Sequence, residues 1–255
     1  MEFFDGHYAL ITGAASGVGE AVAEALAARG ARLALVDCNG AALDALCDRL
    51  GDAVRLKQTG DVADERLWEA MAPDLAGLDC AVVNAGVAGA GPIVDLPFAE
   101  WRRIVSVNLD GAFLTLKAAM RAMKQGARGG AIVLTSSASG VKAEPGVAAY
   151  GAAKAAMIHL AKVAAKEGAP DAIRVNAIAP GGVETPVWRE MPFFVDLVRE
   201  KGSEAAAFRA MAEMATPLGR YARPDEIAGQ ILFLLSDMAA TITGATLTSD
   251  GGYSL

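Results

Sequence analysis

The sequence predicts an α/β protein with a doubly wound parallel sheet of about seven strands and helices on both faces. Short β-rich runs alternate with longer helical runs along the 255 residues, and their short connections imply right-handed crossovers. Hydrophobic residues make up 53% of the chain, which is ample for a sheet that is buried on both faces. Because no Pro/Ser-rich linker or internal repeat divides the chain, one domain is expected over residues 1–255.

The strands are expected where short apolar, β-rich runs end in turn signals. The first run, Tyr8 to Thr12, precedes a glycine-bearing turn and an alanine-rich helix that ends near Arg29. Further strands are predicted at 32–37, 54–58, 79–84, 131–136, 173–179 and 245–249. Helical patterning predicts further helices at 41–50, 64–75, 97–124, 149–167 and 225–235.

The stretch from Gly181 to Pro217 breaks this alternation. At that edge of an open α/β sheet, a long excursion is expected to form a lid or a substrate wall. Its large apolar side chains are Trp188, Met191, Phe193, Phe194, Phe208, Met211 and Met214. They indicate an apolar or bulky substrate, with Trp188 and Phe194 as candidate contacts. A helix pair that packs its own core is an equally favoured interpretation.

Composition excludes several function classes. A net charge of −7 without a cluster of Lys and Arg argues against a nucleic-acid surface. The most apolar stretches are interrupted before they reach membrane-spanning length, and residues 1–6 lack the basic start of a secretory signal. A cytoplasmic protein is therefore expected.

Cysteine and histidine usage argues against metal and triad chemistry. Cys38, Cys47 and Cys80 show no C-x-x-C spacing and are expected to be small buried hydrophobes. His7 and His159 are the only histidines, and neither has a ligand-like neighbour at suitable spacing. This weakens both a zinc hydrolase and a Ser-His-Asp hydrolase, and no metal is expected.

A glycine-rich turn lies where the first strand meets the first helix. Glycine there lets the backbone turn tightly and approach a pyrophosphate, which the N–H groups of the helix N-terminus can bind. The spacing is G-x-x-x-G-x-G rather than G-x-G-x-x-G. The residues of this turn are Thr12, Gly13, Ser16, Gly17, Val18 and Gly19.

Asp37 ends the second predicted strand, 20 residues after Gly17. A carboxylate at this position can accept hydrogen bonds from the ribose hydroxyls of an adenosine and would repel the extra phosphate of NADP. No Arg or Lys stands beside it in the run Val36 to Asn39. NAD is therefore predicted over NADP, and an NADP-dependent reductase is the main alternative.

Two further polar segments follow the third and fourth predicted strands. They are Asp61-Val62 and Asn84-Ala85-Gly86. Each is compatible with ordinary turn chemistry, but both fall at the carboxyl edge of the sheet, where ligands bind in such folds.

Tyr150 and Lys154 lie at i and i+4, on one face of a predicted helix. A free tyrosine has a pKa near 10, and a nearby cation lowers that pKa toward working pH. Upstream, the hydroxyl-rich run Thr135 to Ser139 follows a strand and can donate to a substrate oxygen. Asn108 interrupts an apolar helical pattern, which indicates either exposure or a specific purpose.

Taken together and in order, these segments resemble the short-chain dehydrogenase/reductase family, in its compact single-domain, Rossmann-like branch. The resemblance rests on the glycine-rich turn, Asn84-Ala85-Gly86, Asn108, Ser137, Tyr150-x-x-x-Lys154 and Pro180-Gly181, and it covers essentially the whole chain.

The resemblance implies a role for each matching residue. Tyr150 corresponds to the acid/base, and Ser137, 13 residues upstream, corresponds to the catalytic serine. Lys154 would hold the nicotinamide ribose and lower the tyrosine pKa, and Asn108 would support a water-linked proton path. The cofactor contacts it implies are Gly13, Ser16, Gly17, Val18, Gly19, Asp37, Asp61, Val62, Asn84, Ala85, Gly86, Pro180, Gly181, Val183 and Thr185.

The implied reaction is hydride transfer between NAD(H) and a secondary alcohol or ketone. A homotetramer or homodimer is expected, through the helices near residues 100–124 and 150–167. A catalytically silent NAD-binding module is the alternative from another class. It predicts the loss of at least one of Asn108, Ser137, Tyr150 and Lys154, all of which are present.

Overall fold

The structure is a computed structural model that describes residues 4–255. Its centre is a sheet of seven parallel strands in the order β3-β2-β1-β4-β5-β6-β7, which confirms the predicted fold class. The strands are β1 (Tyr8–Thr12), β2 (Arg32–Asp37), β3 (Val54–Thr59), β4 (Cys80–Val83), β5 (Gly130–Thr135), β6 (Ile173–Pro180) and β7 (Thr246–Ser249).

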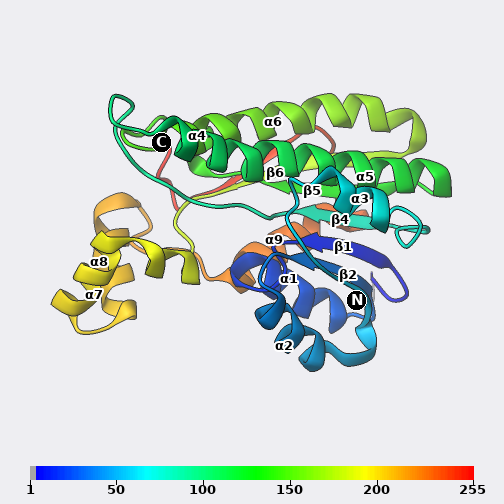
Figure 1. Cartoon of the computed structure of the whole chain (residues 1–255), viewed down its shortest axis with the longest axis horizontal. Helices are drawn as coiled ribbons and strands as arrows, with labels where there is room; N and C mark the ends of the chain where they lie inside the picture. The colour runs from blue at the N-terminus through cyan, green and yellow to red at the C-terminus, as the bar shows by residue number, and fades with distance from the viewer. Residues whose placement is uncertain (1–3) are drawn as a thin grey trace.

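Helices cover both faces of this sheet (Figure 1). On one face, α1 (Gly17–Ala27), α2 (Gly40–Leu50) and α9 (Pro224–Leu235) pack over an aliphatic core. On the other face lie α3 (Glu65–Met71), α4 (Phe98–Val105), α5 (Gly111–Gly126) and α6 (Ala148–Gly168), over a second core. The remaining helices, α7 (Pro192–Lys201) and α8 (Glu204–Ala215), lie to one side of the body.

The order of the strands determines where a ligand can bind. The chain passes from β1 outward to β3, and then returns to place β4 on the other side of β1. Ala9 of β1 pairs in parallel with Leu33 of β2 on one side and with Cys80 of β4 on the other. Because the winding reverses between β1 and β4, a crevice is expected outside their carboxyl ends.

The helix predicted at 97–124 is interrupted. It is divided into α4 and α5 by a π-helical turn, Ser106–Asp110. A π turn shifts the hydrogen-bond pattern from i→i+4 to i→i+5 and is often found at functional sites. The predicted helical region is therefore confirmed, with a π turn that the sequence did not predict, and Asn108 lies in this turn.

The stretch after β6 contains the predicted excursion, and α7 and α8 form most of it. They enclose a small core of their own, in which Phe194, Phe208 and Tyr221 are buried. Phe194 is only 1% exposed, and Trp188 packs against the same cluster. Five of the seven large apolar side chains thus pack against one another, as the alternative interpretation held, whereas Phe193 and Met214 are exposed. We call the part of this stretch from the short helix Pro186–Glu190 onward, residues 186–217, the lid.

The cysteines are less uniform than predicted. Cys80 is buried, Cys47 is half-buried and Cys38 is exposed. The prediction of small buried hydrophobes is therefore confirmed for Cys80 and wrong for Cys38, which follows the end of β2 where the chain leaves the sheet.

Candidate active site

The glycine-rich turn and the segment after β4 lie side by side at the carboxyl edge of the sheet. The Asn84 side-chain amide donates to the carbonyl oxygens of Thr12 and Gly13, at 3.1 and 3.3 Å. The Thr12 hydroxyl accepts from the N–H groups of Asn84 and Ala85, at 3.0 and 3.2 Å. Asn84 and Ala85 thus hold the turn in place, and the ends of β1 and β4 form one wall.

The backbone of the turn requires glycine. Gly13 and Gly17 adopt left-handed conformations, with φ of +62° and +58°, which cost other residues free energy. At Gly19, a Cβ would overlap the Gly13 carbonyl oxygen. The N-cap residue of α1, Ser16, makes no side-chain capping hydrogen bond. The first-turn N–H groups that have no intrahelical partner are therefore available to an anion.

Replacing Gly19 with alanine is expected to lower the free energy of unfolding by about 1–3 kcal/mol and to weaken cofactor binding, because the turn must open. The matched control is Gly229→Ala in α9, where a Cβ meets nothing within 4 Å. That change should raise stability by about 0.5–1 kcal/mol. Urea unfolding checks both, and equal stability of the two variants would contradict the close approach.

Asp37 has a structural role that the sequence did not reveal. Its carboxylate accepts the Ala15 N–H at 2.9 Å and the Asn39 N–H at 2.8 Å. The end of β2 is thereby tied to the glycine-rich turn. Asp37 is only partly buried, so its oxygens remain accessible at the edge of the crevice.

The segment after β3 is ordered by two contacts. The Asp61 carboxylate accepts the Ala63 N–H at 2.9 Å, and the Trp68 indole donates to the Val62 carbonyl at 2.8 Å. Val62 is buried, and a Cβ on Gly111 would lie 2.5 Å from its Cγ2. Asp61 and Val62 therefore occupy fixed positions at the same edge as Asp37.

Tyr150 and Ser137 are 13 residues apart in the sequence, and the fold places their side chains next to each other. Tyr150 lies in the first turn of α6, and Ser137 is the N-cap of the short helix Ala138–Gly140. Burial raises the pKa of Tyr150, and hydrogen bonding with the Ser137 side chain has a smaller, opposite effect on that pKa. Ser136 instead donates to the Lys154 carbonyl at 2.8 Å. Ser137 is thus the serine paired with the tyrosine.

Lys154 is buried beneath this pair. Its Nζ lies 5.6 Å from the centre of the Tyr150 ring and donates to the Thr135 carbonyl at 2.9 Å. Burial lowers the pKa of Lys154 to about 8. The expected lowering of the tyrosine pKa by this lysine is not what the structure shows, because burial dominates at Tyr150 and raises its pKa.

Asn108 is fully buried in the π turn. Its side-chain amide donates to the carbonyls of Val87 and Ile104, at 2.8 and 2.9 Å, whereas its Oδ1 has no partner within residues 4–255. A Cβ on Gly86 would lie 2.6 Å from that Oδ1 and 3.4 Å from Lys154 Nζ. A buried acceptor without a partner next to an ammonium group is the type of place where an ordered water is bound.

The segment after β6 completes this edge. Pro180 ends β6, and a Cβ on Gly181 would lie 2.8 Å from Asp250 Cα. Thr185 reaches the glycine-rich turn, since a Cβ on Gly17 would lie 3.1 Å from its Cγ2. The Val183 N–H has no hydrogen-bond partner among the described residues. The predicted nicotinamide segment therefore lies against the predicted phosphate turn.

Neither a metal-binding cluster nor a membrane-spanning helix occurs among the described residues. Between residues 4 and 255, no group of three or more His, Cys, Asp and Glu side chains is arranged to hold a metal ion. Over the same residues, no helix combines the length and the apolar character needed to cross a membrane.

Comparison with known proteins agrees with this geometry. A family model described as enoyl-(acyl carrier protein) reductase matches residues 13–254. The chain is 39% identical to cis-4-hydroxycyclohexanecarboxylate dehydrogenase of Sinomonas cyclohexanicum, over 99% of this chain and 98% of that protein. It is 40% identical to L-tagatose-forming galactitol 2-dehydrogenase of Cereibacter sphaeroides, over 98% and 96%. A short-chain type dehydrogenase/reductase from Mycobacterium marinum superposes with a TM-score of 0.85 at 36% identity, over 99% and 97% of the two chains. This chain therefore belongs to the short-chain dehydrogenase/reductase family of oxidoreductases.

Proposed function

We propose that this protein is an NAD(H)-dependent dehydrogenase/reductase that interconverts a secondary alcohol and a ketone. The observation that carries the proposal is the placement of Ser137, Tyr150, Lys154 and Asn108 at one sheet edge, next to a glycine-rich helix N-terminus. No single motif implies this chemistry, whereas a hydroxyl pair, a buried ammonium and a dinucleotide-type turn together do.

The residues present fit a dinucleotide. The uncapped first turn of α1 suits a pyrophosphate, and Asp37 offers carboxylate oxygens at the end of β2. The Val183 N–H, which has no partner among the described residues, suits the oxygen of a carboxamide. We assign the adenine to Asp61 and Val62, and the wall beside the nicotinamide to Asn84, Ala85 and Gly86.

When bound, NAD(H) supplies or accepts the hydride. The chain's own residues handle the proton. In the direction of reduction, Tyr150 donates its hydroxyl proton to the carbonyl oxygen of the substrate, and Ser137 donates a hydrogen bond to the same oxygen. Lys154 is then placed to return a proton toward the tyrosine, and Asn108 Oδ1, which has no partner among the described residues, offers an acceptor for a connecting water. Alcohol oxidation reverses these steps.

Asp37 should determine the choice between NADH and NADPH. Asp37→Ser is expected to reduce the ratio of kcat/KM for NADH over NADPH by at least about tenfold, because charge-assisted hydrogen bonds to ribose are lost and repulsion of a phosphate is removed. Asp37→Asn, which keeps one oxygen acceptor for the Ala15 N–H, controls for loosening of the turn. A wild-type preference for NADPH would contradict the assignment of NAD.

The direct test is a spectrophotometric screen of secondary alcohols with NAD and of ketones with NADH. The relatives named above act on a cyclic hydroxy acid and on a polyol, so the panel needs charged and polyhydroxylated compounds as well as apolar ones. The predicted preference for apolar substrates fails if charged compounds turn over faster. Contacts of Trp188 and Phe194 with substrate stay predictions, and the burial of Phe194 would require the lid to rearrange.

We also infer a homodimer or homotetramer through α5 and α6. Phe113 and Val163 on these helices are 49% and 40% exposed, and a hollow between the helices is lined by apolar residues that include Leu109, Ala156 and Leu160. Sedimentation of the purified protein tests this inference, and a monomer at micromolar concentration would contradict it.

A further inference from the structure

A tryptophan of the lid holds the carbonyl group of Val183. The Trp188 Nε1 donates to Val183 O at 2.7 Å, and the Thr185 N–H donates to the same oxygen at 2.8 Å. A carbonyl oxygen has two lone pairs. Both are therefore engaged by the two short hydrogen bonds, and the Thr185 hydroxyl is a weaker third donor at 3.4 Å. Of the three donors, the indole is the one that comes from the lid.

The two peptide groups that flank Val183 are each fixed by hydrogen bonds. The Gly182 carbonyl accepts the Ala222 N–H at 3.0 Å, and the Glu184 N–H donates to the Ala222 carbonyl at 2.9 Å. In a trans peptide the N–H points away from the C=O of the same unit. The Val183 N–H must therefore point away from Ala222, and it has no hydrogen-bond partner among the described residues.

Trp188 belongs to the aromatic core of the lid. Its ring stacks on Tyr221, with centroids 5.8 Å apart, and meets Phe208 edge-on at 6.3 Å. The Tyr221 ring in turn packs on Gly182, where a Cβ would overlap it. The lid core thus contacts the segment around Val183 twice, through the indole hydrogen bond and through the Tyr221 ring.

We propose that Trp188 is a positioning residue that couples the docked lid to affinity for the nicotinamide half of the cofactor. This proposal rests on the proposed function, in which the Val183 N–H binds the carboxamide. When the lid leaves, Val183 O loses its indole donor, and the Val183 backbone is less well ordered. Because coupling is reciprocal, a ligand that engages Val183 also favours the docked lid, whereas one without nicotinamide does not.

The binding test compares NADH with ADP-ribose, which shares the adenosine diphosphate part and lacks nicotinamide. Trp188→Phe removes the donor and keeps an aromatic ring. By calorimetry, the Kd for NADH should rise about fivefold, as for the loss of one hydrogen bond, and the Kd for ADP-ribose should not change.

Trp68→Phe is the matched control, because the Trp68 indole also donates to a backbone carbonyl, that of Val62, at 2.8 Å. Val62 lies in the predicted adenine segment. Any effect of this variant on Kd should therefore be the same for NADH and ADP-ribose, which leaves their ratio unchanged.

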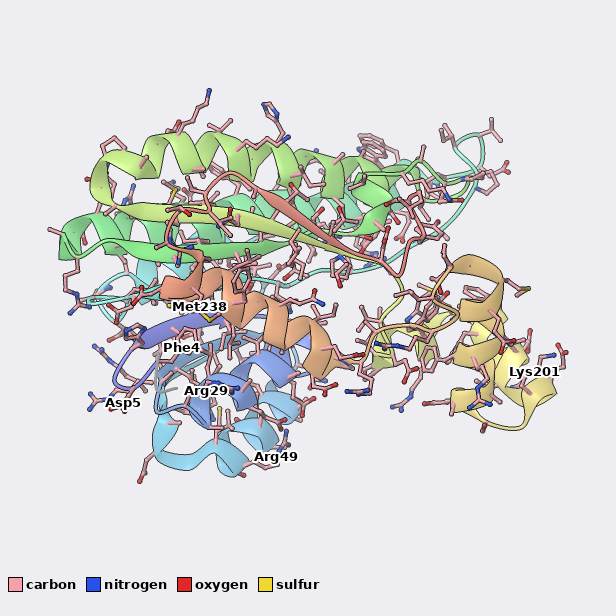
Figure 2. The ribbon with its side chains drawn as sticks, turned by 180° about the vertical axis from the view of Figure 1, so that it is seen from behind. Phe4, Asp5, Arg29, Arg49, Lys201 and Met238 are labelled. Carbon is pink, nitrogen blue, oxygen red and sulfur yellow. The ribbon has the colours of Figure 1, made fainter. Side chains whose placement is uncertain are left out.

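A second measurement follows the lid in the unmodified protein. Lys201 is exposed at the outer end of the lid, far from the body (Figure 2), and offers a site for trypsin. NADH should slow cleavage after Lys201, and ADP-ribose at saturation should not. In Trp188→Phe the protection by NADH should be lost.

The outcomes separate the two proposals. If wild-type protein binds NADH no more tightly than ADP-ribose, the proposed nicotinamide site is wrong. If NADH binds more tightly but both ligands give the same cleavage rate, the coupling is wrong and the proposed function stands. An unchanged ratio of Kd values in Trp188→Phe also contradicts the coupling.

Discussion

Replacing Tyr150 with phenylalanine is expected to lower kcat by about a hundred- to ten-thousandfold, the contribution typical of a positioned general acid or base. The variant loses only the hydroxyl that pairs with Ser137. It keeps the ring that lies 5.6 Å from the Lys154 ammonium. The Kd for NADH should therefore change by no more than about twofold, since the hydroxyl is assigned to the substrate oxygen and not to the cofactor.

The same substitution elsewhere provides the control. Tyr8 lies at the start of β1, at the opposite edge of the sheet from the site, and its hydroxyl donates to the Asp74 carbonyl at 3.1 Å. Tyr8→Phe removes one hydroxyl without touching the crevice, and kcat should be unchanged. Steady-state rates with the best alcohol from the screen, together with NADH titrations, check both variants. Full kcat in Tyr150→Phe would overturn the assignment of the acid/base.

The strands were the most predictable part of the fold. In a parallel sheet covered on both faces, strands read as nearly continuous apolar runs, so β1 and β2 begin and end where the sequence predicts. The break between α4 and α5 was not predictable from the sequence. A π turn has less favourable local backbone hydrogen bonds than an α-helix, and tertiary contacts compensate for them. Here those contacts include the Asn108 amide with the Val87 carbonyl, across 21 residues.

Sequence spacing identified the candidate site residues, but it could not predict their burial or their hydrogen bonds. Tyr150 and Lys154 share a helix face because of their spacing, and the motif order placed Ser137 near them. The depth of burial that lowers the pKa of Lys154 depends on the whole fold. The same holds for Asp37, whose bond to the Ala15 N–H joins two strand ends. The sequence predicted Trp188 as one of several large apolar side chains of the lid, but it did not indicate the hydrogen bond of Trp188 to the Val183 carbonyl.

Lys154→Met is expected to separate activity from stability. The ammonium group lies 5.6 Å from the centre of the Tyr150 ring, and its loss should lower kcat/KM by about a hundredfold or more. Stability should not fall. The folded chain must bury a charged group that is 3% exposed, and burial lowers its pKa from 10.5 to about 8. At pH 7 this corresponds to a cost of about 3 kcal/mol, which methionine avoids.

The pH dependence of stability tests whether the buried Lys154 ammonium destabilises the folded chain. Between about pH 8 and pH 10.5, Lys154 is largely neutral in the folded chain but still protonated in the unfolded chain. The unfolded state then binds more protons, so wild-type stability rises with pH relative to Lys154→Met, which does not titrate there. Urea unfolding at pH 7, 9 and 10 should show the advantage of the variant shrinking. A constant difference would mean that the folded and unfolded chains bind the same number of protons over this range, which would contradict the lowering of the Lys154 pKa by burial.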